Sequence, residues 1–179
     1  EFVQSFEAND PRLRFTVARN NEPYFGLIFK NSFSSTFFSP RKFIQSDDEL
    51  SQKADGDINY PAIRYAEVLL WEAEALVELG RVQEALVPLE AVRARARAQA
   101  TGMNVLPAIV STDQTFVRDA IRQERKVELG YELHRFFDLV RWGIAADVLE
   151  GFQVGKHEVF PLPQTEIDLN PSLDQNAGY

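Results

Sequence analysis

The sequence predicts a mainly α-helical fold, because apolar residues recur at helical spacing from residue 61 onward. Apolar positions three and four residues apart form one stripe over residues 61–98 and another over residues 115–149. Residues 1–60 are instead polar, aromatic and irregular, and residues 150–179 contain three prolines and few periodic positions. We therefore expect a single domain in which a loop-rich N-terminal part precedes a helical hairpin, further charged and aromatic helices, and an extended C-terminal tail.

The composition excludes several classes of protein. The net charge of -8 argues against nucleic acid, because phosphate binding requires clustered lysine and arginine. The chain has no cysteine, so it offers no disulfide, no thiol nucleophile and no cysteine-based metal site. It has no run of about 18 apolar residues, so no transmembrane helix is expected. Because it begins with Glu1 and shows no signal peptide, we expect a fragment of a longer protein.

The N-terminal part is expected to contain short strands and loops. Residues 13–17 alternate like a short strand, and residues 24–29 are a second strand candidate that is ambiguous with a short buried helix. Residues 32–39 form a loop rich in serine and phenylalanine. The acidic residues 46–59 are expected to form a solvated loop.

Residues 61–98 are expected to form two antiparallel helices. Pro61 suits the first turn of the first helix, where a missing N–H is harmless, and Gly80 is placed as its C-terminal cap. Pro88 lies within the second helix and should kink it or delay its start. The hairpin resembles a tetratricopeptide repeat in its small and apolar positions, and a single repeat must stack on neighbours to bury its face.

The remaining helices follow a connecting loop. Thr112 or Asp113 is expected to cap a helix that covers about residues 116–129. Residues 131–148 are then expected to form a separate helix rich in aromatic side chains. The tail should contain one helical turn, at residues 165–167.

Residues 121–143 mix charged, apolar and aromatic side chains so densely that no helical face is purely apolar. Glu124 and Glu128 continue an apolar stripe and therefore face a packing surface. They are either a catalytic pair flanking a scissile bond or carboxylates held by arginines. We favour the second interpretation, because charges in a helix interface must be paired and arginines are abundant nearby. The expected structural ion-pair network consists of Arg64, Glu124, Arg125, Glu128, Arg135, Asp138 and Arg141.

Other catalytic and metal-binding patterns are missing from the sequence. The spacing of its two histidines, His134 and His157, excludes a two-histidine metal site on one helix. There is no G-x-S-x-G motif and no glycine-rich phosphate-binding loop. We therefore expect no catalytic residue, no metal and no cofactor, and an acid/base hydrolase is the least favoured function.

Aromatic side chains in the loop-rich N-terminal part are the candidates for ligand binding. Loops on a rigid scaffold often carry binding residues, and aromatic faces can stack on sugar rings while polar groups bind the hydroxyls. The alternative is that these aromatics only anchor the loops to the helical body. The candidate residues are Tyr24, Phe25, Asn31, Phe37, Phe38 and Arg41.

Several short sequence words occur in an order that is typical of one family. The most specific is RFFDLVRWG at residues 135–143, preceded by ERKVEL at 124–129 and followed by QNAGY at 175–179. Further words are DPRL at residues 10–13, RKF at 41–43, IRYAEVLL at 63–70 and FPLP at 160–163. In these words the chain resembles the C-terminal portion of the SusD/RagB family.

The resemblance implies a mostly α-helical, non-catalytic nutrient-binding protein with tetratricopeptide-like units. Members are lipoproteins on the outer surface of the outer membrane of Bacteroidota. They deliver glycans or other nutrients to a SusC-like TonB-dependent transporter. The resemblance also implies a longer protein, whose lipid-bearing cysteine is absent from this chain, and it carries over no ligand-contact residue. The alternative function is a tetratricopeptide-like protein–protein interaction module.

Overall fold

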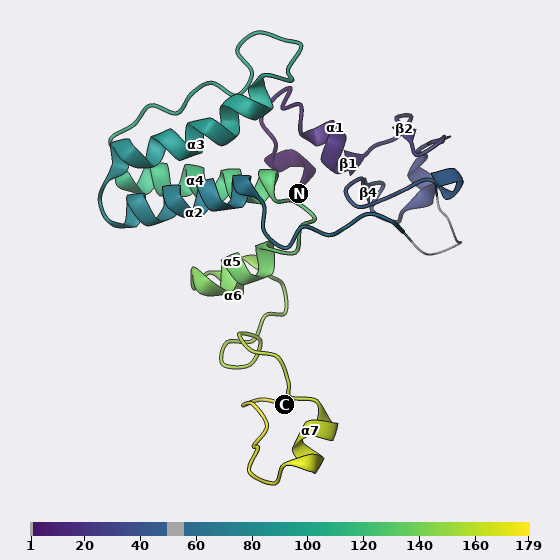
Figure 1. Cartoon of the computed structure of the whole chain (residues 1–179), viewed down its shortest axis with the longest axis vertical. Helices are drawn as coiled ribbons and strands as arrows, with labels where there is room; N and C mark the ends of the chain where they lie inside the picture. Colours follow the sequence, from purple (N-terminus) through teal and green to yellow (C-terminus); the bar gives the residue numbers. More distant parts are fainter. Residues whose placement is uncertain (1, 50–55) are drawn as a thin grey trace. The chain divides into compact units, whose positions relative to one another are not determined.

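The computed structural model describes residues 2–49 and 56–179. The chain forms two compact units, Glu1–Glu132 and Leu133–Tyr179, and each is described by itself. The longest elements of the chain are helices, and the described strands are two residues long (Figure 1). The predicted mainly α-helical class is therefore confirmed.

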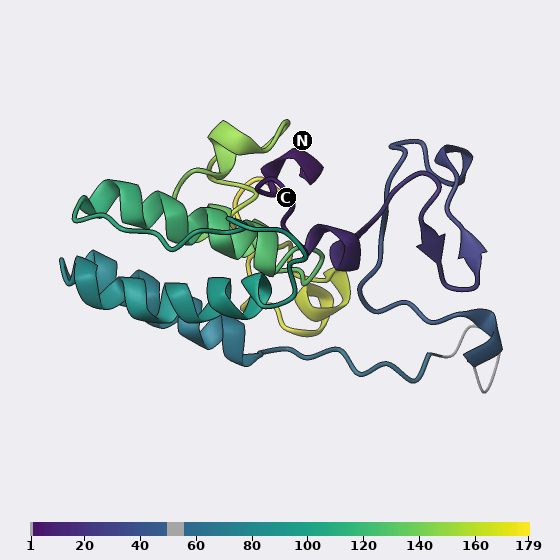
Figure 2. The same cartoon turned by 90° about the horizontal axis from the view of Figure 1, so that it is seen from above.

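Three helices make the body of the first unit: α2 (Tyr65–Glu78), α3 (Val82–Arg97) and α4 (Gln114–Glu128). Helix α2 packs against both α3 and α4, and the three lie side by side in both ribbon views (Figures 1 and 2). Each large apolar side chain buried between them stabilises the fold by about 1.5–3 kcal/mol. The core consists of Leu70, Ala73, Val77, Ala85, Leu89, Val92, Val117, Ile121 and Leu129.

The ends of these helices test the predicted caps. Gly80 follows α2 with a φ of 74°, where glycine avoids the steric strain of a side chain, so it caps the helix as predicted. Asp113 caps α4 by accepting a hydrogen bond from the Phe116 N–H at 2.8 Å. The prediction for Pro61 was wrong, because α2 begins only at Tyr65. Pro88 lies inside α3 and does not delay its start.

The N-terminal segment of the first unit has short elements. Residues 13–17 are not a strand, as the sequence had suggested, because the helical turn α1 comes first and only Val17 enters a strand. Strands β1 and β4 pair antiparallel, with Val17 opposite Pro40. The elements are η1 (Val3–Ser5), α1 (Leu13–Thr16), β1 (Val17–Ala18), β2 (Pro23–Tyr24), β3 (Leu27–Ile28), η2 (Asn31–Phe33), β4 (Ser39–Pro40) and η3 (Asp47–Glu49).

The second predicted strand, residues 24–29, is in fact divided between two short strands by a turn. Phe25 and Gly26 have φ values of 44° and 78°, and two consecutive residues with positive φ make the tight turn of a β-hairpin. Strands β2 and β3 flank it, with Tyr24 opposite Leu27. The predicted acidic loop at 46–59 lies partly outside the described residues, and its described part contains η3.

The second unit contains α5 (Arg135–Arg141), α6 (Ala145–Val148) and α7 (Gln164–Leu169). The single helix predicted over residues 131–148 was wrong. Helix α5 ends before Gly143, whose φ of 70° breaks the helical path, and α6 is a separate short helix. Helix α7 confirms the helical turn predicted in the tail.

The C-terminal tail folds back on itself. The Gln175 side-chain amide accepts from the Leu162 N–H at 2.8 Å and donates to the Leu162 carbonyl oxygen at 2.9 Å, as a neighbouring strand would. The Tyr179 hydroxyl donates to the Val159 carbonyl oxygen at 3.0 Å. These bonds bring Gln175 and Tyr179 back beside residues 159–162. Within the described residues, no helix is long and apolar enough to cross a membrane.

Candidate functional site

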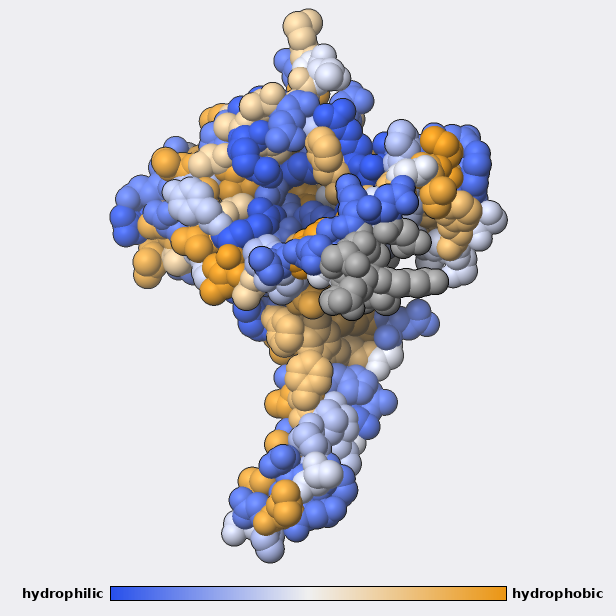
Figure 3. All heavy atoms as spheres, turned by 45° about the vertical axis from the view of Figure 1, so that its right-hand side comes forward, coloured by the Kyte–Doolittle hydropathy of each residue, from blue (hydrophilic) through white to orange (hydrophobic). Residues whose placement is uncertain are grey.

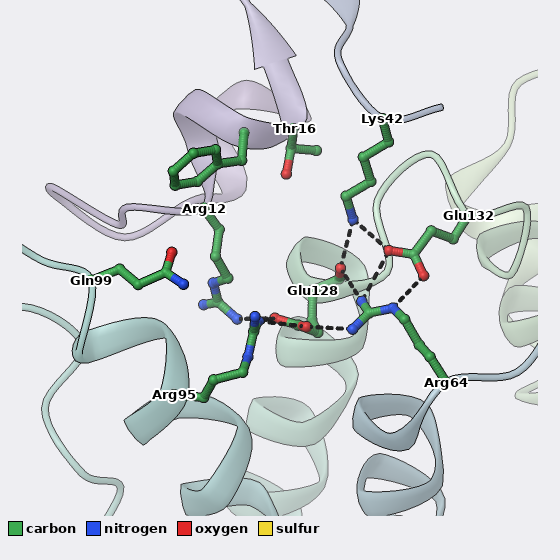
Figure 4. A pocket seen from close by; sticks show the side chains of 9 residues that line it. Arg12, Thr16, Lys42, Arg64, Arg95, Gln99, Glu128 and Glu132 are labelled. Carbon is green, nitrogen blue, oxygen red and sulfur yellow. Dashed lines mark hydrogen bonds and ion pairs between the residues drawn. The ribbon is translucent and has the colours of Figure 1, made fainter. Parts of the chain in front are cut away.

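The first unit gathers cations and carboxylates into one group, which we call the ion-pair cluster (Figure 4). Its members come from the N-terminal segment, from the residue before α2, and from α3, α4 and the turn after α4. They are Glu7, Asp10, Arg12, Lys42, Arg64, Arg93, Arg95, Glu124, Glu128 and Glu132. Within this group the charges balance, with five cations and five carboxylates.

Glu128 is the centre of the ion-pair cluster. Its side chain is 2% exposed, and its carboxylate lies 2.8 Å from the Arg64 guanidinium, 2.8 Å from that of Arg95 and 3.0 Å from that of Arg12. Burial by itself would raise the pKa of Glu128, but the three arginines outweigh burial and lower it below its ordinary value. Glu128 is therefore held as an anion.

Arg12 connects the N-terminal segment to α4. Its guanidinium contacts the Glu124 and Glu128 carboxylates and also pairs with Asp10 at 2.7 Å. Burial alone would lower the pKa of Arg12, yet the contacts with Asp10 and Glu124 raise it. The second oxygen of Glu124 lies 2.9 Å from the Arg93 guanidinium, so this carboxylate is also fully engaged.

Glu132 and the Glu128 carbonyl oxygen bind both Arg64 and Lys42. The Arg64 Nε lies 2.6 Å from one Glu132 oxygen, and the Lys42 Nζ lies 2.5 Å from the other. The same Lys42 amine donates to the Glu128 carbonyl oxygen at 2.9 Å. Burial lowers the pKa of Lys42, against the opposing effect of Glu132. Figure 4 shows the Lys42 and Arg64 side chains converging on Glu132 from two different segments.

The other residues of the expected network lie elsewhere. Arg125 is buried on α4, with its guanidinium 3.7 Å from the Glu67 carboxylate. In the second unit, the Arg141 guanidinium lies 2.9 Å from Asp138 one helical turn away. Burial lowers the pKa of Arg135, and its guanidinium lies 5.7 Å from the centre of the Trp142 ring.

Seven members of the ion-pair cluster lie outside the expected network, namely Glu7, Asp10, Arg12, Lys42, Arg93, Arg95 and Glu132. The least predictable of the seven were Asp10, Arg12 and Lys42. They lie in irregular sequence far from α4 and follow no periodic pattern. The only signal for them was their presence in the words DPRL and RKF.

A cavity of about 340 Å³ opens beside the ion-pair cluster. A glycosidase-like mechanism would need one carboxylic acid with a raised pKa in such a place. The pKa of Glu128 is lowered instead, and Glu124 is almost fully shielded from solvent. The lining residues are Arg12, Phe15, Thr16, Lys42, Arg64, Arg95, Gln99, Glu128 and Glu132. This arrangement is suited to holding segments together more than to proton transfer.

Acid is expected to destabilise the first unit through Glu128. A carboxylate whose pKa is lower in the folded state than in the unfolded state stabilises the fold above its unfolded pKa of about 4.3. That contribution is lost as the pH falls through the folded value, so the melting temperature followed by circular dichroism should drop below about pH 5. The decrease in melting temperature below about pH 5 should be shallower in Glu128→Gln than in the parent chain. An equally steep decrease in both would contradict the assignment of this pH dependence to Glu128.

The β2–β3 hairpin contains two of the aromatic candidates. The Tyr24 and Phe25 rings meet edge to face with centroids 5.2 Å apart. They border a cavity of about 320 Å³, which we call the hairpin cavity. Its lining residues are Tyr24, Phe25, Gly26, Leu27, Ile44, Gln45, Ser46 and Asp48. Apolar atoms, in orange, reach the surface of this N-terminal part at the upper right of Figure 3.

The other candidates do not line the hairpin cavity. Asn31 begins η2, and its backbone N–H donates to the Asn20 side chain. Phe37 is 58% exposed, Phe38 is half-buried, and the Arg41 backbone N–H donates to the Thr16 carbonyl oxygen. Sequence reasoning missed the polar lining residues Gln45, Ser46 and Asp48. Ser46 and Asp48 begin the acidic stretch that was interpreted as a solvated loop, and Gln45 directly precedes it.

The geometry can be compared with known proteins. The family model described as the SusD family (SusD_RagB) matches residues 1–159. The chain belongs to the SusD family. Among curated relatives, a SusD-like protein, P25, of Formosa agariphila is 31% identical over 100% of this chain and 34% of its own length. Another SusD-like protein of that organism, P2, is 33% identical over 70% of this chain and 27% of its own length.

Solved structures of SusD-like proteins share the fold. A SusD-like protein of Bacteroides fragilis matches 99% of this chain and 46% of its own, with a TM-score of 0.79 and 22% identity. A SusD superfamily protein of Bacteroides vulgatus matches 95% of this chain and 40% of its own, with a TM-score of 0.73 and 26% identity. This SusD-family chain thus spans about a third of the length of the curated relatives named above.

Proposed function

We propose that this chain is the C-terminal portion of a non-catalytic nutrient-binding protein of the cell surface. The full-length protein would be lipid-anchored at the outer surface of the outer membrane and would deliver glycans to a SusC-like TonB-dependent transporter. Membership of the SusD family supports the general class, since SusD-like proteins are binding proteins for nutrients. The observation that carries the proposal for this chain is the hairpin cavity.

The hairpin cavity combines the two kinds of group that bind sugars. The Tyr24 and Phe25 rings supply apolar faces, and the tight turn between β2 and β3 fixes their positions. The Gln45 side-chain oxygen accepts from the Asp57 N–H at 2.7 Å, which orients its NH₂ group as a donor. The exposed carboxylate of Asp48 is an acceptor for hydroxyls. A carboxylate at the rim favours neutral over anionic glycans.

The ion-pair cluster would support this site by anchoring the segment that carries it. Arg12 precedes the hairpin, Lys42 lies two residues before the cavity residue Ile44, and Arg64 follows the segment. The three cations bind carboxylates on α4 and on the turn after it. The irregular segment is therefore fixed to the helical body at three points, which supplies the rigid scaffold that a binding loop needs.

A tetratricopeptide-like protein–protein interaction module is the second candidate. A groove of about 460 Å³ runs between α2 and α3. Two of its lining side chains, Tyr65 and Val87, are 75% and 71% exposed. Exposed apolar side chains on a helical hairpin are typical of a surface that packs against another helix or chain.

Tyr24→Ala is expected to weaken glycan binding at least about tenfold, because the variant loses one stacking face. The measurement is calorimetry on the full-length protein with the oligosaccharide that binds best on a glycan array. Tyr24→Phe keeps the ring and should retain the affinity, and Tyr65→Ala in the α2–α3 groove should leave it unchanged. Failure of the full-length protein to bind any glycan or peptide nutrient would exclude the proposal. Loss of a protein partner on Tyr65→Ala would favour the second candidate.

A further inference from the structure

The second unit has a cavity of its own, which we call the tail cavity. Its volume is about 450 Å³, and most of its wall is aromatic or aliphatic. The Phe136 ring lies 6.4 Å from the ring of Phe152 and 6.2 Å from that of Phe160, centroid to centroid. The lining residues are Phe136, Leu149, Glu150, Gly151, Phe152, His157, Val159, Phe160 and Tyr179. Phe160 and Tyr179 lie beyond the residues that the family model matches.

The fold-back of the tail holds Tyr179 in the wall of the tail cavity. Its hydroxyl is bonded to the Val159 carbonyl oxygen, and the Lys156 amine lies 4.8 Å from the centre of its ring. Gly178 has a φ of 89°, a backbone conformation that favours glycine, and a Cβ there would also lie 3.0 Å from the Lys156 side chain. The contacts with Val159 and Lys156 therefore hold Tyr179 in the wall of the tail cavity.

Two aromatic rings of the wall are also open to solvent. Phe160 is 65% exposed and Tyr179 is 45% exposed, although other rings pack against Phe160. An exposed ring that is held in place offers its face to a ligand at little entropic cost.

The tail cavity has an oriented donor and an acceptor. The Nδ1 of His157 accepts a hydrogen bond from the Gln153 N–H at 3.0 Å, so the neutral imidazole carries its proton on Nε2. Edge-to-face contact with Phe152, at 5.7 Å between centroids, further orients this imidazole. The carboxylate of Glu150 is exposed and forms no ion pair among the described residues.

We propose that the tail cavity is a second carbohydrate site, which takes one neutral pyranose unit of a glycan. The ring faces of Phe160 and Tyr179 would stack on the sugar, the Glu150 carboxylate would accept from adjacent hydroxyls, and His157 would donate from Nε2. The volume falls within the range of about 300–1,000 Å³ that is usual for small-molecule sites.

The charges of the tail cavity select the ligand class. The Glu150 carboxylate disfavours anionic sugars, and the Lys156 ammonium beside the Tyr179 ring disfavours cationic ones. The choice of a glycan over other neutral ligands rests on the function proposed above. The site itself is independent of the hairpin cavity, because it is built entirely from residues of the second unit.

Nuclear magnetic resonance of the histidines can test this proposal directly. The chain contains His157, whose Cε1–H signal in the full-length protein can be assigned as the one that disappears in a His157→Gln variant. The full-length protein would be titrated with maltohexaose, cellohexaose, xylohexaose and mannohexaose. A saturable shift of the His157 signal with at least one probe is expected. Phe160→Ala should raise the apparent dissociation constant about tenfold, and Tyr24→Ala should leave it unchanged.

The controls separate this proposal from the function proposed for the hairpin cavity. Glu150→Gln changes an exposed side chain, should leave the fold intact, and should weaken the His157 shift. If the probes bind in calorimetry but the His157 signal does not move, the tail cavity is not a carbohydrate site, while the hairpin cavity stands. If the His157 shift is unaffected by both Phe160→Ala and Glu150→Gln, the proposal is also wrong. If no probe binds at the tail cavity or at the hairpin cavity, both proposals fail.

Discussion

Glu128→Gln is expected to lower the free energy of unfolding by about 3–5 kcal/mol. The reason is not that each ion pair adds greatly to stability. Removing the charge leaves the guanidinium groups of Arg12, Arg64 and Arg95 crowded around a neutral amide, with Arg12 almost fully buried. Uncompensated buried charge is costly, whereas glutamine keeps the size of the side chain. Urea denaturation followed by circular dichroism would measure the loss.

The matched control is Glu84→Gln. Glu84 pairs with Arg81 as Glu128 pairs with its arginines, but both side chains are more than half exposed. Surface pairs of this kind contribute little, so this variant should unfold at the same urea concentration as the parent chain. Equal stability of Glu128→Gln and Glu84→Gln would contradict the structural role proposed for the ion-pair cluster.

Arg12→Met is expected to destabilise the chain by about 3–5 kcal/mol and also to loosen one segment selectively. Methionine preserves much of the apolar stem, so the variant isolates the loss of the guanidinium. Asp10, Glu124 and Glu128 all lose a donor when it is removed. Hydrogen exchange measured by mass spectrometry should therefore speed up in residues 17–45 more than in α2, whose core contacts remain.

A nearby arginine provides the control for this change. Arg14 lies on α1, two residues after Arg12, but is exposed, and its guanidinium stacks over the Phe15 ring at 4.6 Å. Arg14→Met should change neither the unfolding free energy nor the exchange of residues 17–45. If Arg12→Met speeds exchange uniformly over the whole first unit, the segment is not held specifically through Arg12.

The helices could be predicted from the sequence because periodicity and caps are local signals. Gly80 and Asp113 end and begin helices for reasons that lie within a few residues of each. The short strands could not be predicted in the same way. Residues 24–29 contain apolar and aromatic side chains that favour a strand, but the positive φ of Phe25 and Gly26 turns the chain in the middle.

The candidate sites were predictable only in part, for a related reason. Glu124 and Glu128 stood out because they continue an apolar stripe on one helix. Their partner Arg12 lies more than 100 residues away in irregular sequence, where no periodic pattern marks it. Tyr24 and Phe25 are adjacent in sequence and both line the hairpin cavity, whereas Phe37 lies outside it. Side chains brought together by tertiary folding leave no short-range signal.

The central claim is that the buried carboxylates stabilise the folded first unit, whereas the hairpin aromatics contact the ligand. Calorimetric titration of the full-length Glu128→Gln and Tyr24→Ala variants with the same oligosaccharide, well below either melting temperature, tests it most directly. We expect folded Glu128→Gln to keep its affinity within about twofold while losing stability. Tyr24→Ala removes the packing of its ring on Phe29 but should lose less stability than Glu128→Gln, and it should lose affinity at least about tenfold. A folded Glu128→Gln variant that no longer binds, beside a Tyr24→Ala variant that binds normally, would contradict the claim.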